Sequence, residues 1–77
     1  MYKAYIMVVT FPEKTKEVFE SLTNNEQIEE VHEVMGPYDI VIEVRVKDLA
    51  QLPDFITALR KIEGVEQTMS LVTFPES

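Results

Sequence analysis

The segment DIVIEVRVKDLAQLPDFITALRKIEGV, residues 39–65, contains the change of periodicity that decides the fold. Its first part, 39–47, is rich in β-branched residues and alternates cleanly in its latter half, which predicts a strand. Asp48 and Gln51 then have the spacing of a helical capping box. The following apolar residues have the spacing of one helix face: Leu49, Leu52, Phe55, Ile56, Leu59 and Ile62. Gly64 is predicted to close this helix as its C′ residue.

The remainder of the chain supplies one more helix and three more strands. Pro53 lies one turn after the predicted cap, where a proline removes a donor, so the regular second helix is expected to begin there. Residues 4–10, AYIMVVT, predict a strand, and Pro12 opens a first helix that ends near the sequence TNNE. Residues 28–35 and 65–74 predict the other two strands.

The order of elements is strand, helix, strand, strand, helix, strand. The short connection Gly36-Pro37-Tyr38 joins the two middle strands and predicts an antiparallel hairpin. This order is that of the split βαβ, or ferredoxin-like, α+β sandwich, in which a four-stranded antiparallel sheet carries both helices on one face. No linker or low-complexity tract divides the chain, so residues 1–77 are expected to form a single domain.

Composition excludes several classes of function. The chain has 77 residues, no cysteine, and 14 acidic against 7 basic side chains, for a net charge of −7. Direct binding of nucleic acid or of an anionic membrane is therefore not expected. No apolar run is long enough for a membrane span or a signal peptide, so we expect a cytoplasmic protein. A chain this short without disulfides is expected to gain stability from oligomerisation.

The first strand is apolar on both faces. One face carries Ala4, Ile6 and Val8, and the other carries Tyr5, Met7 and Val9. The two helices can cover only one face of the sheet. We therefore expect a second copy of the chain to cover the other face, in an obligate homodimer with sheet packed against sheet.

Residues suited to catalysis are sparse. His32 is the single histidine, and it falls in a predicted strand among glutamates. No serine lies in a nucleophile elbow, and with two glycines there is no phosphate-binding loop. We expect no catalytic residue, no metal site and no cofactor. His32 and Tyr38 remain the candidates if the protein is an enzyme.

The Gly-Pro-Tyr-Asp turn admits two interpretations. Gly36 can adopt positive φ and Asp39 can form an Asx turn, so these residues suit a purely structural turn. Tyr38 is not required by a turn, however, and a phenol beside a carboxylate could recognise a small polar ligand. Thr68 and Ser70 offer two hydroxyls on one face of the last strand. Local chemistry leaves both interpretations open.

The chain resembles the ligand-binding regulatory domain of the Lrp/AsnC transcription regulators, called the RAM domain. The resemblance extends from about Ala4 to Phe74. It depends on a glycine, a variable residue and Tyr-Asp at the start of an apolar strand, then the helix LPDFITALRKIEGV and the closing strand EQTMSLV. Its most specific positions are Gly36, Tyr38, Asp39, Leu59, Gly64, Val65 and Thr68.

This resemblance implies a dimeric α+β barrel whose dimers assemble into rings, commonly tetramers of dimers. It also implies that small effectors, typically amino acids, bind where dimers meet. Carried over to this chain, the ligand-binding residues are Gly36, Tyr38 and Asp39 from the turn, with Thr68 and Ser70 as hydroxyl partners. In this reading Asp39 would accept from the ammonium of the amino acid, the Thr68 hydroxyl would donate to its carboxylate, and Tyr38 would close the pocket.

Two departures from the family pattern bear on function. The sequence starts at the first strand, without the helix-turn-helix DNA reader of full-length members, so it resembles the stand-alone form of the domain. The last strand has Ser70 where threonine is usual, and Pro37 stiffens the turn. The prediction is an amino-acid-sensing module that modulates transcription by assembling with itself or with full-length regulators. The alternatives are an oligomerisation module without a ligand and a small dimeric α+β barrel enzyme.

Overall fold

A computed structural model describes residues 1–75 of the chain. The elements run in the order β1 (Tyr2–Thr10), η1 (Pro12–Lys14), α1 (Thr15–Thr23), β2 (Ile28–Glu33), β3 (Ile40–Val46), η2 (Leu49–Gln51), α2 (Leu52–Arg60) and β4 (Val65–Val72). The sheet has the strand order β2-β3-β1-β4, and every neighbouring pair is antiparallel. The predicted ferredoxin-like βαββαβ architecture is confirmed.

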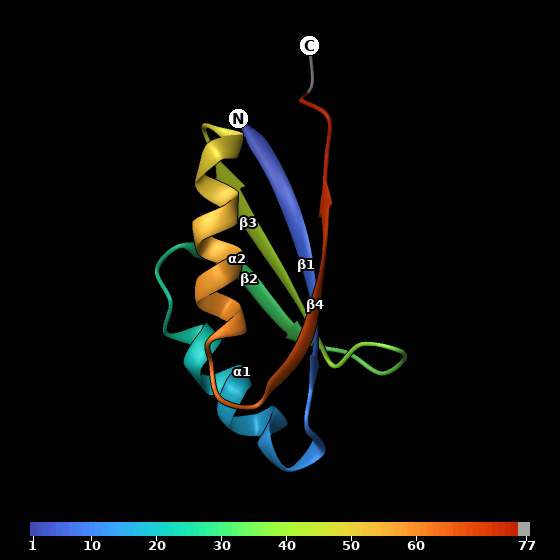
Figure 1. Cartoon of the computed structure of the whole chain (residues 1–77). Helices are drawn as coiled ribbons and strands as arrows, with labels where there is room; N and C mark the ends of the chain where they lie inside the picture. Colours follow the sequence, from blue (N-terminus) through green and yellow to red (C-terminus); the bar gives the residue numbers. More distant parts are fainter. Residues whose placement is uncertain (76–77) are drawn as a thin grey trace.

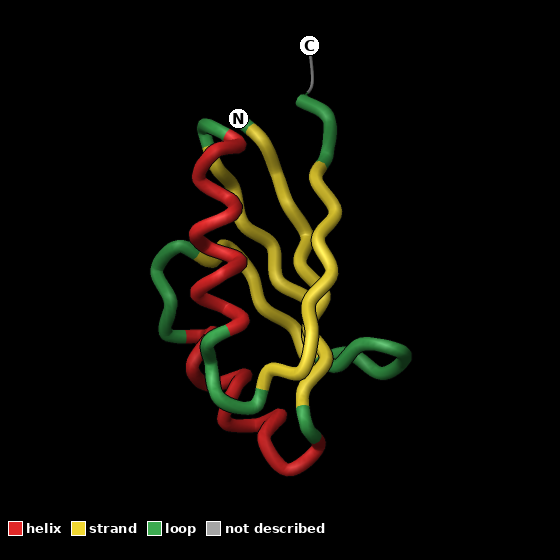
Figure 2. The backbone as a smooth tube through the Cα atoms, viewed as in Figure 1, coloured by secondary structure: helices red, strands yellow, loops and turns green. Residues whose placement is uncertain are grey.

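Both helices lie on one side of the sheet, and the other side of the sheet is open (Figure 1). The tube view shows the same two layers, with the loop between β2 and β3 projecting away from the helices (Figure 2). The register fixes which residues share a face, because directly opposed residues of antiparallel strands point the same way. Ile6 lies opposite Ile42 and Val8 opposite Ile40, so these four side chains share the helix-covered face.

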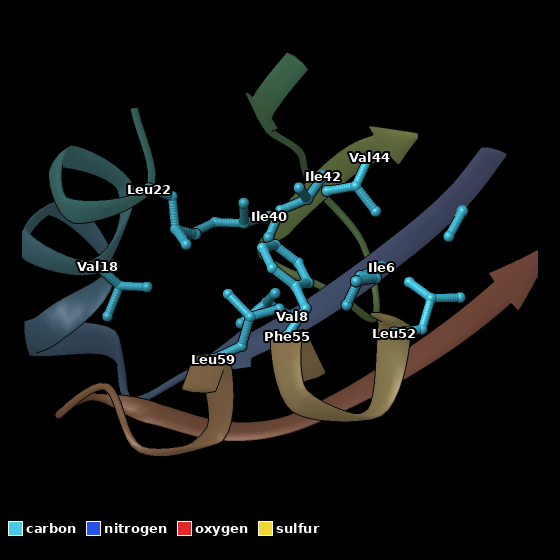
Figure 3. Close-up of a cluster of buried hydrophobic side chains, with 11 residues drawn as sticks. Ile6, Val8, Val18, Leu22, Ile40, Ile42, Val44, Leu52, Phe55 and Leu59 are labelled. Atoms are coloured by element: carbon cyan, nitrogen blue, oxygen red, sulfur yellow. The ribbon is translucent and has the colours of Figure 1, made fainter. Parts of the chain in front are cut away.

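The core fills the space between this face and the helices (Figure 3). Val18 and Leu22 of α1 and Leu52, Phe55 and Leu59 of α2 meet the strand residues there. Each such side chain, once buried, contributes about 1.5–3 kcal/mol of transfer free energy. The apolar stripe predicted from the spacing of the second helix is therefore the face that packs against the sheet, except that Leu49 lies at the exposed start, in η2.

The start of the second helical segment follows the sequence closely. Asp48 and Gln51 form both halves of the predicted capping box around η2. The Asp48 side chain accepts from the amide of Ala50 at 3.0 Å, and the Gln51 side chain accepts from the amide of Asp48 at 3.2 Å. The regular helix α2 begins at Leu52 with Pro53 in its first turn, where the missing N–H is tolerated.

The end of this helix was predicted wrongly. α2 ends at Arg60 with Lys61 as its cap, so Gly64 is not its C′ residue. A separate turn follows, in which the Val65 amide donates to the Ile62 carbonyl at 3.1 Å, and Gly64 takes a φ of 103° inside it. The positive φ favours glycine at this position, which lies in the turn that leads into β4.

Five strand boundaries also differ from the predictions. β1 begins at Tyr2 instead of residue 4, and β2 ends at Glu33 instead of residue 35. β3 spans Ile40–Val46 instead of 39–47, and β4 ends at Val72 instead of residue 74. The connection between β2 and β3 therefore has six residues, 34–39, in place of the three predicted. We refer to residues 34–39 as the β2–β3 loop.

None of the helices in the described part of the chain has the length and apolar character needed to cross a bilayer.

Candidate functional site

The β2–β3 loop is closed at its base and open at its tip. The amide of Val34 donates to the carbonyl of Asp39 at 2.9 Å, which continues the hairpin pairing for one step beyond the strands. Beyond this bond, Met35, Gly36 and Pro37 are exposed. Gly36 has a φ of 147°, and a Cβ placed there would meet no heavy atom within 4 Å. The tip of the loop is therefore exposed, and it projects on the open side of the sheet (Figure 1).

Asp39 is attached to the neighbouring strand by two hydrogen bonds. Its amide donates to the carbonyl of Val8 at 2.9 Å, and its Oδ2 accepts from the amide of Thr10 at 2.8 Å. The predicted Asx turn is therefore replaced by a long-range contact with the end of β1. Thr10 is 3% exposed, so its amide needs a partner inside the protein. One carboxylate oxygen of Asp39 is thus committed to holding β1 and β3 together.

Tyr38 reaches back over the open face of the sheet. Its hydroxyl donates to the Sδ of Met69 in β4, and the two atoms are 3.0 Å apart. Met69 lies directly opposite Met7 of β1, so the phenol ends among apolar side chains of the open face. Neither Met69 nor Thr10 was identified as a partner of the turn from the sequence. The alternation of residues along the predicted strands could have placed Met69 beside Met7. No sequence pattern near the β2–β3 loop, however, indicates which strand residues its six residues reach.

The two hydroxyls of the last strand lie on the other face. Thr68 is directly opposite Val8, and Ser70 is directly opposite Ile6, so both point toward the helix layer. Both residues are half-buried on β4, which is an edge strand of the sheet. Within one protomer the structure therefore brings Tyr38 and Asp39 together in the loop but separates Tyr38 from Thr68 and Ser70 by the thickness of the sheet.

His32 and Lys14 lie outside the β2–β3 loop. His32 is exposed, and its Nε2 lies 2.9 Å from Oε1 of Glu30, two residues earlier on the same strand. Among residues 1–75, no group of three or more potential metal ligands is close enough to hold a metal ion. The pKa of Lys14, the last residue of η1, is raised by a hydrogen bond and the negative charge of Glu17.

Two hollows of the described surface lie away from the loop. One, of about 370 Å³, is formed by the first residues of β1, Arg45 and the segment after β4. The other, of about 520 Å³, lies between the start of β2, the end of β3 and the start of α2. Neither of these two hollows is lined by residues 36–39 or 68–70.

Comparison of the chain with models of known protein families identifies one family. A family model described as the Lrp/AsnC ligand binding domain matches residues 3–76. The chain belongs to this family. The Lrp/AsnC domain is 35% identical over 69 residues to the HTH-type transcriptional regulator FL11 of Pyrococcus abyssi, a match that covers 90% of this chain and 46% of FL11. The chain thus spans about half the length of the curated relatives it matches.

Solved structures of other proteins share this fold. TTHA0845 from Thermus thermophilus superposes with a TM-score of 0.91 at 33% identity, with coverage of 100% of this chain and 98% of that one. The transcriptional regulator NMB0573 from Neisseria meningitidis, solved as an L-Met complex, superposes with a TM-score of 0.84 at 18% identity, covering 97% of this chain and 51% of that one. The predicted family is therefore confirmed, and the relatives named as HTH-type regulators place this chain in a regulatory class of domain.

Proposed function

We propose that this chain is an amino-acid-binding regulatory module whose ligand site is completed only when copies assemble. The observation that carries this proposal is the geometry of the β2–β3 loop. Asp39 is fixed to β1 and Tyr38 to Met69, while the tip of the loop at Met35 is fully exposed. A loop whose base is held by hydrogen bonds and whose tip is exposed is suited to form one wall of a site between subunits.

Assembly through the open face of the sheet is supported by its composition. Met69 and Leu71 of β4 are 50% and 56% exposed, and Tyr5, Met7 and Val41 on the neighbouring strands are only partly covered. Contiguous apolar side chains on a sheet face favour association. A homodimer with sheet against sheet would bury them, and assembly of such dimers into a ring, such as a tetramer of dimers, would bring the loop of one dimer to the next.

An amino acid fits the groups that the loop and β4 can offer across such a contact. Its ammonium needs an acceptor, and Asp39 retains a second carboxylate oxygen beyond the one bonded to Thr10. Its carboxylate needs donors, and Thr68 and Ser70 of a neighbouring subunit carry hydroxyls at an edge strand. The L-Met complex of NMB0573 shows that a protein with this fold can be isolated with an amino acid.

The regulatory output would be a change of assembly. An effector shifts an assembly equilibrium only by its differential affinity for the assembled form. With a net charge of −7, this chain would act on transcription through a DNA-binding partner, and HTH-type regulators similar to FL11 are the class of partner that could share its oligomer.

One observation favours the alternative of an oligomerisation module without a ligand. Neither of the two hollows described above is lined by residues 36–39, and side chains of a second copy could fill the space beside the loop. The enzyme alternative loses support, because His32 is exposed and lines neither hollow.

A ligand screen with matched variants tests the proposal. We expect at least one of the twenty amino acids to raise the melting temperature and to change the molar mass measured by light scattering. Asp39→Asn, which can still accept from the Thr10 amide, should abolish both responses, whereas Asp54→Asn on the exposed face of α2 should leave them intact. If no amino acid changes either quantity, the ligand-free oligomerisation module is the better description.

A further inference from the structure

The face of the sheet that the helices leave open (Figure 1) is apolar toward β4 and charged toward β2. Tyr5 of β1 lies between the two parts, directly opposite Leu71 on one side and Glu43 on the other. Directly opposed residues of antiparallel strands point the same way, so the register identifies the charged side chains that share this face. We refer to four of them as the charged strip: Lys3 of β1, Glu43 and Arg45 of β3, and Glu30 of β2.

The charged strip places like charges directly opposite each other. Lys3 lies opposite Arg45, and Glu30 lies opposite Glu43, two residues further along the strands. Like charges in directly opposed positions destabilise a sheet. A protomer therefore has two unfavourable pairs on this face, one of cations and one of carboxylates.

Other charges of the protomer compensate these pairs only in part. Nε of Arg45 lies 3.6 Å from Oε2 of Glu43, two positions away on β3. Glu30 lies 2.9 Å from His32, a side chain that is charged only when protonated. Among residues 1–75, Lys3 forms no ion pair. Lys3 and Glu30 are therefore available to groups outside the protomer.

The distribution of charge suits this face to a second copy of the same chain. In a contact with two-fold symmetry, a residue i of one copy meets a residue j of the other, and j meets i. A strip with two cations beside two carboxylates meets this condition, because the cations of each copy can lie against the carboxylates of the other. Two chains that each have a net charge of −7 repel each other, and Lys3 and Arg45, which are among only 7 basic side chains, offset this repulsion at the contact.

We propose that the charged strip selects the partner of the open face, with Lys3 and Arg45 of one copy paired with Glu30 and Glu43 of the second copy. This inference rests on the sheet-to-sheet homodimer proposed above and names the contacts that make it selective. The apolar part of the face supplies burial, whereas complementary charges at a protein contact contribute mainly to specificity. A sheet that carries like charges at the matching positions is repelled, so the strip favours a copy of this chain over such a partner.

Reversal of each half of the charged strip tests the proposal. The two variants are Lys3→Glu/Arg45→Glu and Glu30→Lys/Glu43→Lys, measured as full chains by light scattering and native mass spectrometry. Each variant alone brings like charges together across the contact, so the Kd of its homodimer should rise at least about tenfold. Mixed in equal amounts, the two variants should form a heterodimer in excess over the share expected from random pairing. This excess should shrink as salt is raised, because salt screens charges.

Two pairs of substitutions on the helix side are matched controls for net charge. Lys16→Glu/Lys61→Glu and Glu20→Lys/Asp54→Lys change the net charge by the same amounts as the two reversed variants, and all four residues are exposed. They lie on α1, on α2 or at the end of α2, away from the open face. These variants should dimerise with nearly the affinity of the natural chain and should pair at random when mixed.

The results separate this inference from the homodimer on which it rests. A natural chain that stays monomeric at all concentrations would overturn both. A dimeric natural chain whose reversed variants dimerise as tightly, or pair at random when mixed, would overturn the role of the charged strip and leave the homodimer intact. The side chain of Glu43 is only 14% exposed, so Glu30→Lys alone replaces the double variant if circular dichroism shows the double variant to be unfolded.

Discussion

Oδ2 of Asp39 accepts a 2.8 Å hydrogen bond from the backbone amide of Thr10, 29 residues earlier in the chain. Together with the bond from the Asp39 amide to the Val8 carbonyl, it joins the start of β3 to the end of β1. These strands are the central pair of the sheet. Asp39 therefore has a structural role whether or not it also binds a ligand, and the two roles must be separated by the choice of substitution.

Substitution of Asp39 by alanine should lower the free energy of unfolding by about 1.5–3 kcal/mol, because a charge-assisted bond is lost and the Thr10 amide is left unsatisfied. Asp39→Asn should lower it by about 1 kcal/mol or less, since an amide oxygen can still accept. Urea unfolding measures both, with Asp54→Asn as the exposed control. Equal losses for alanine and asparagine would contradict the role assigned to the bond.

Substitution at the two glycines should have unequal effects. A Cβ on Gly64 would lie 2.6 Å from Cβ of Lys14 and 2.9 Å from Cγ2 of Val18, whereas a Cβ on Gly36 would meet nothing. Both have positive φ, so both alanine variants bear a backbone penalty of about 1 kcal/mol. Gly64→Ala should lose about 1–3 kcal/mol more from overpacking. Urea midpoints rank the two variants, and similar midpoints would show that α1 moves freely to make room.

The sequence predicts most of this fold because local signals and burial agree. The capping box at Asp48 and the apolar stripe through Leu59 lead to the same helix, and the alternation around Ile42 matches its place in a central strand. The end of the helix was misjudged because the helical spacing extends to Ile62, whereas the backbone leaves the helix after Arg60. A glycine such as Gly64 indicates a turn, but the sequence does not show whether that turn caps α2 or leads into β4.

The candidate site is less predictable from sequence, since it depends on contacts between distant segments. Nothing near Asp39 in the chain indicates that its carboxylate holds the amide of Thr10. Period-two spacing correctly puts Thr68 and Ser70 on one face, but only the strand register shows that this is the helix-covered face. Sequence patterns define faces, and the topology decides what each face meets.

Leu71→Lys should disrupt the proposed homodimer without unfolding the protomer. Leu71 is 56% exposed on the open face, opposite Tyr5, so the new charge is tolerated in a monomer but would be desolvated between two sheets. Light scattering should show a fall from dimer or ring to monomer at micromolar concentrations. The control Glu20→Lys, on the exposed side of α1, should keep the assembly. An unchanged molar mass for Leu71→Lys would show that copies do not meet through this face.

The ion pairs of Lys14 should stabilise the protein below about pH 10.5 and lose their effect above it. Glu17, and more weakly Glu63, raise the pKa of Lys14 from its ordinary value of 10.5. A lysine with a raised pKa in the folded state contributes stability that is complete below the unfolded value and disappears as pH rises through the folded value. The difference in urea midpoint between the natural chain and Lys14→Gln should therefore shrink as pH rises past 10.5. A difference that stays constant to higher pH would indicate lost packing of the lysine stem instead of lost charge.

The substitution Thr68→Val tests whether the Thr68 hydroxyl binds a ligand or whether the threonine has only a structural role in β4. The substitution preserves the shape and the β-branched character of the side chain, and Thr68 is half-buried beside Val8, so stability should change by less than about 1 kcal/mol. If Thr68 donates to an amino acid held by the β2–β3 loop of another subunit, the variant should lose the amino-acid-induced rise in melting temperature while keeping its own melting temperature. Thr57→Val, exposed on α2, is the matched control. A full ligand response from Thr68→Val would remove this hydroxyl from the site and leave Tyr38 and Asp39 as its remaining candidates.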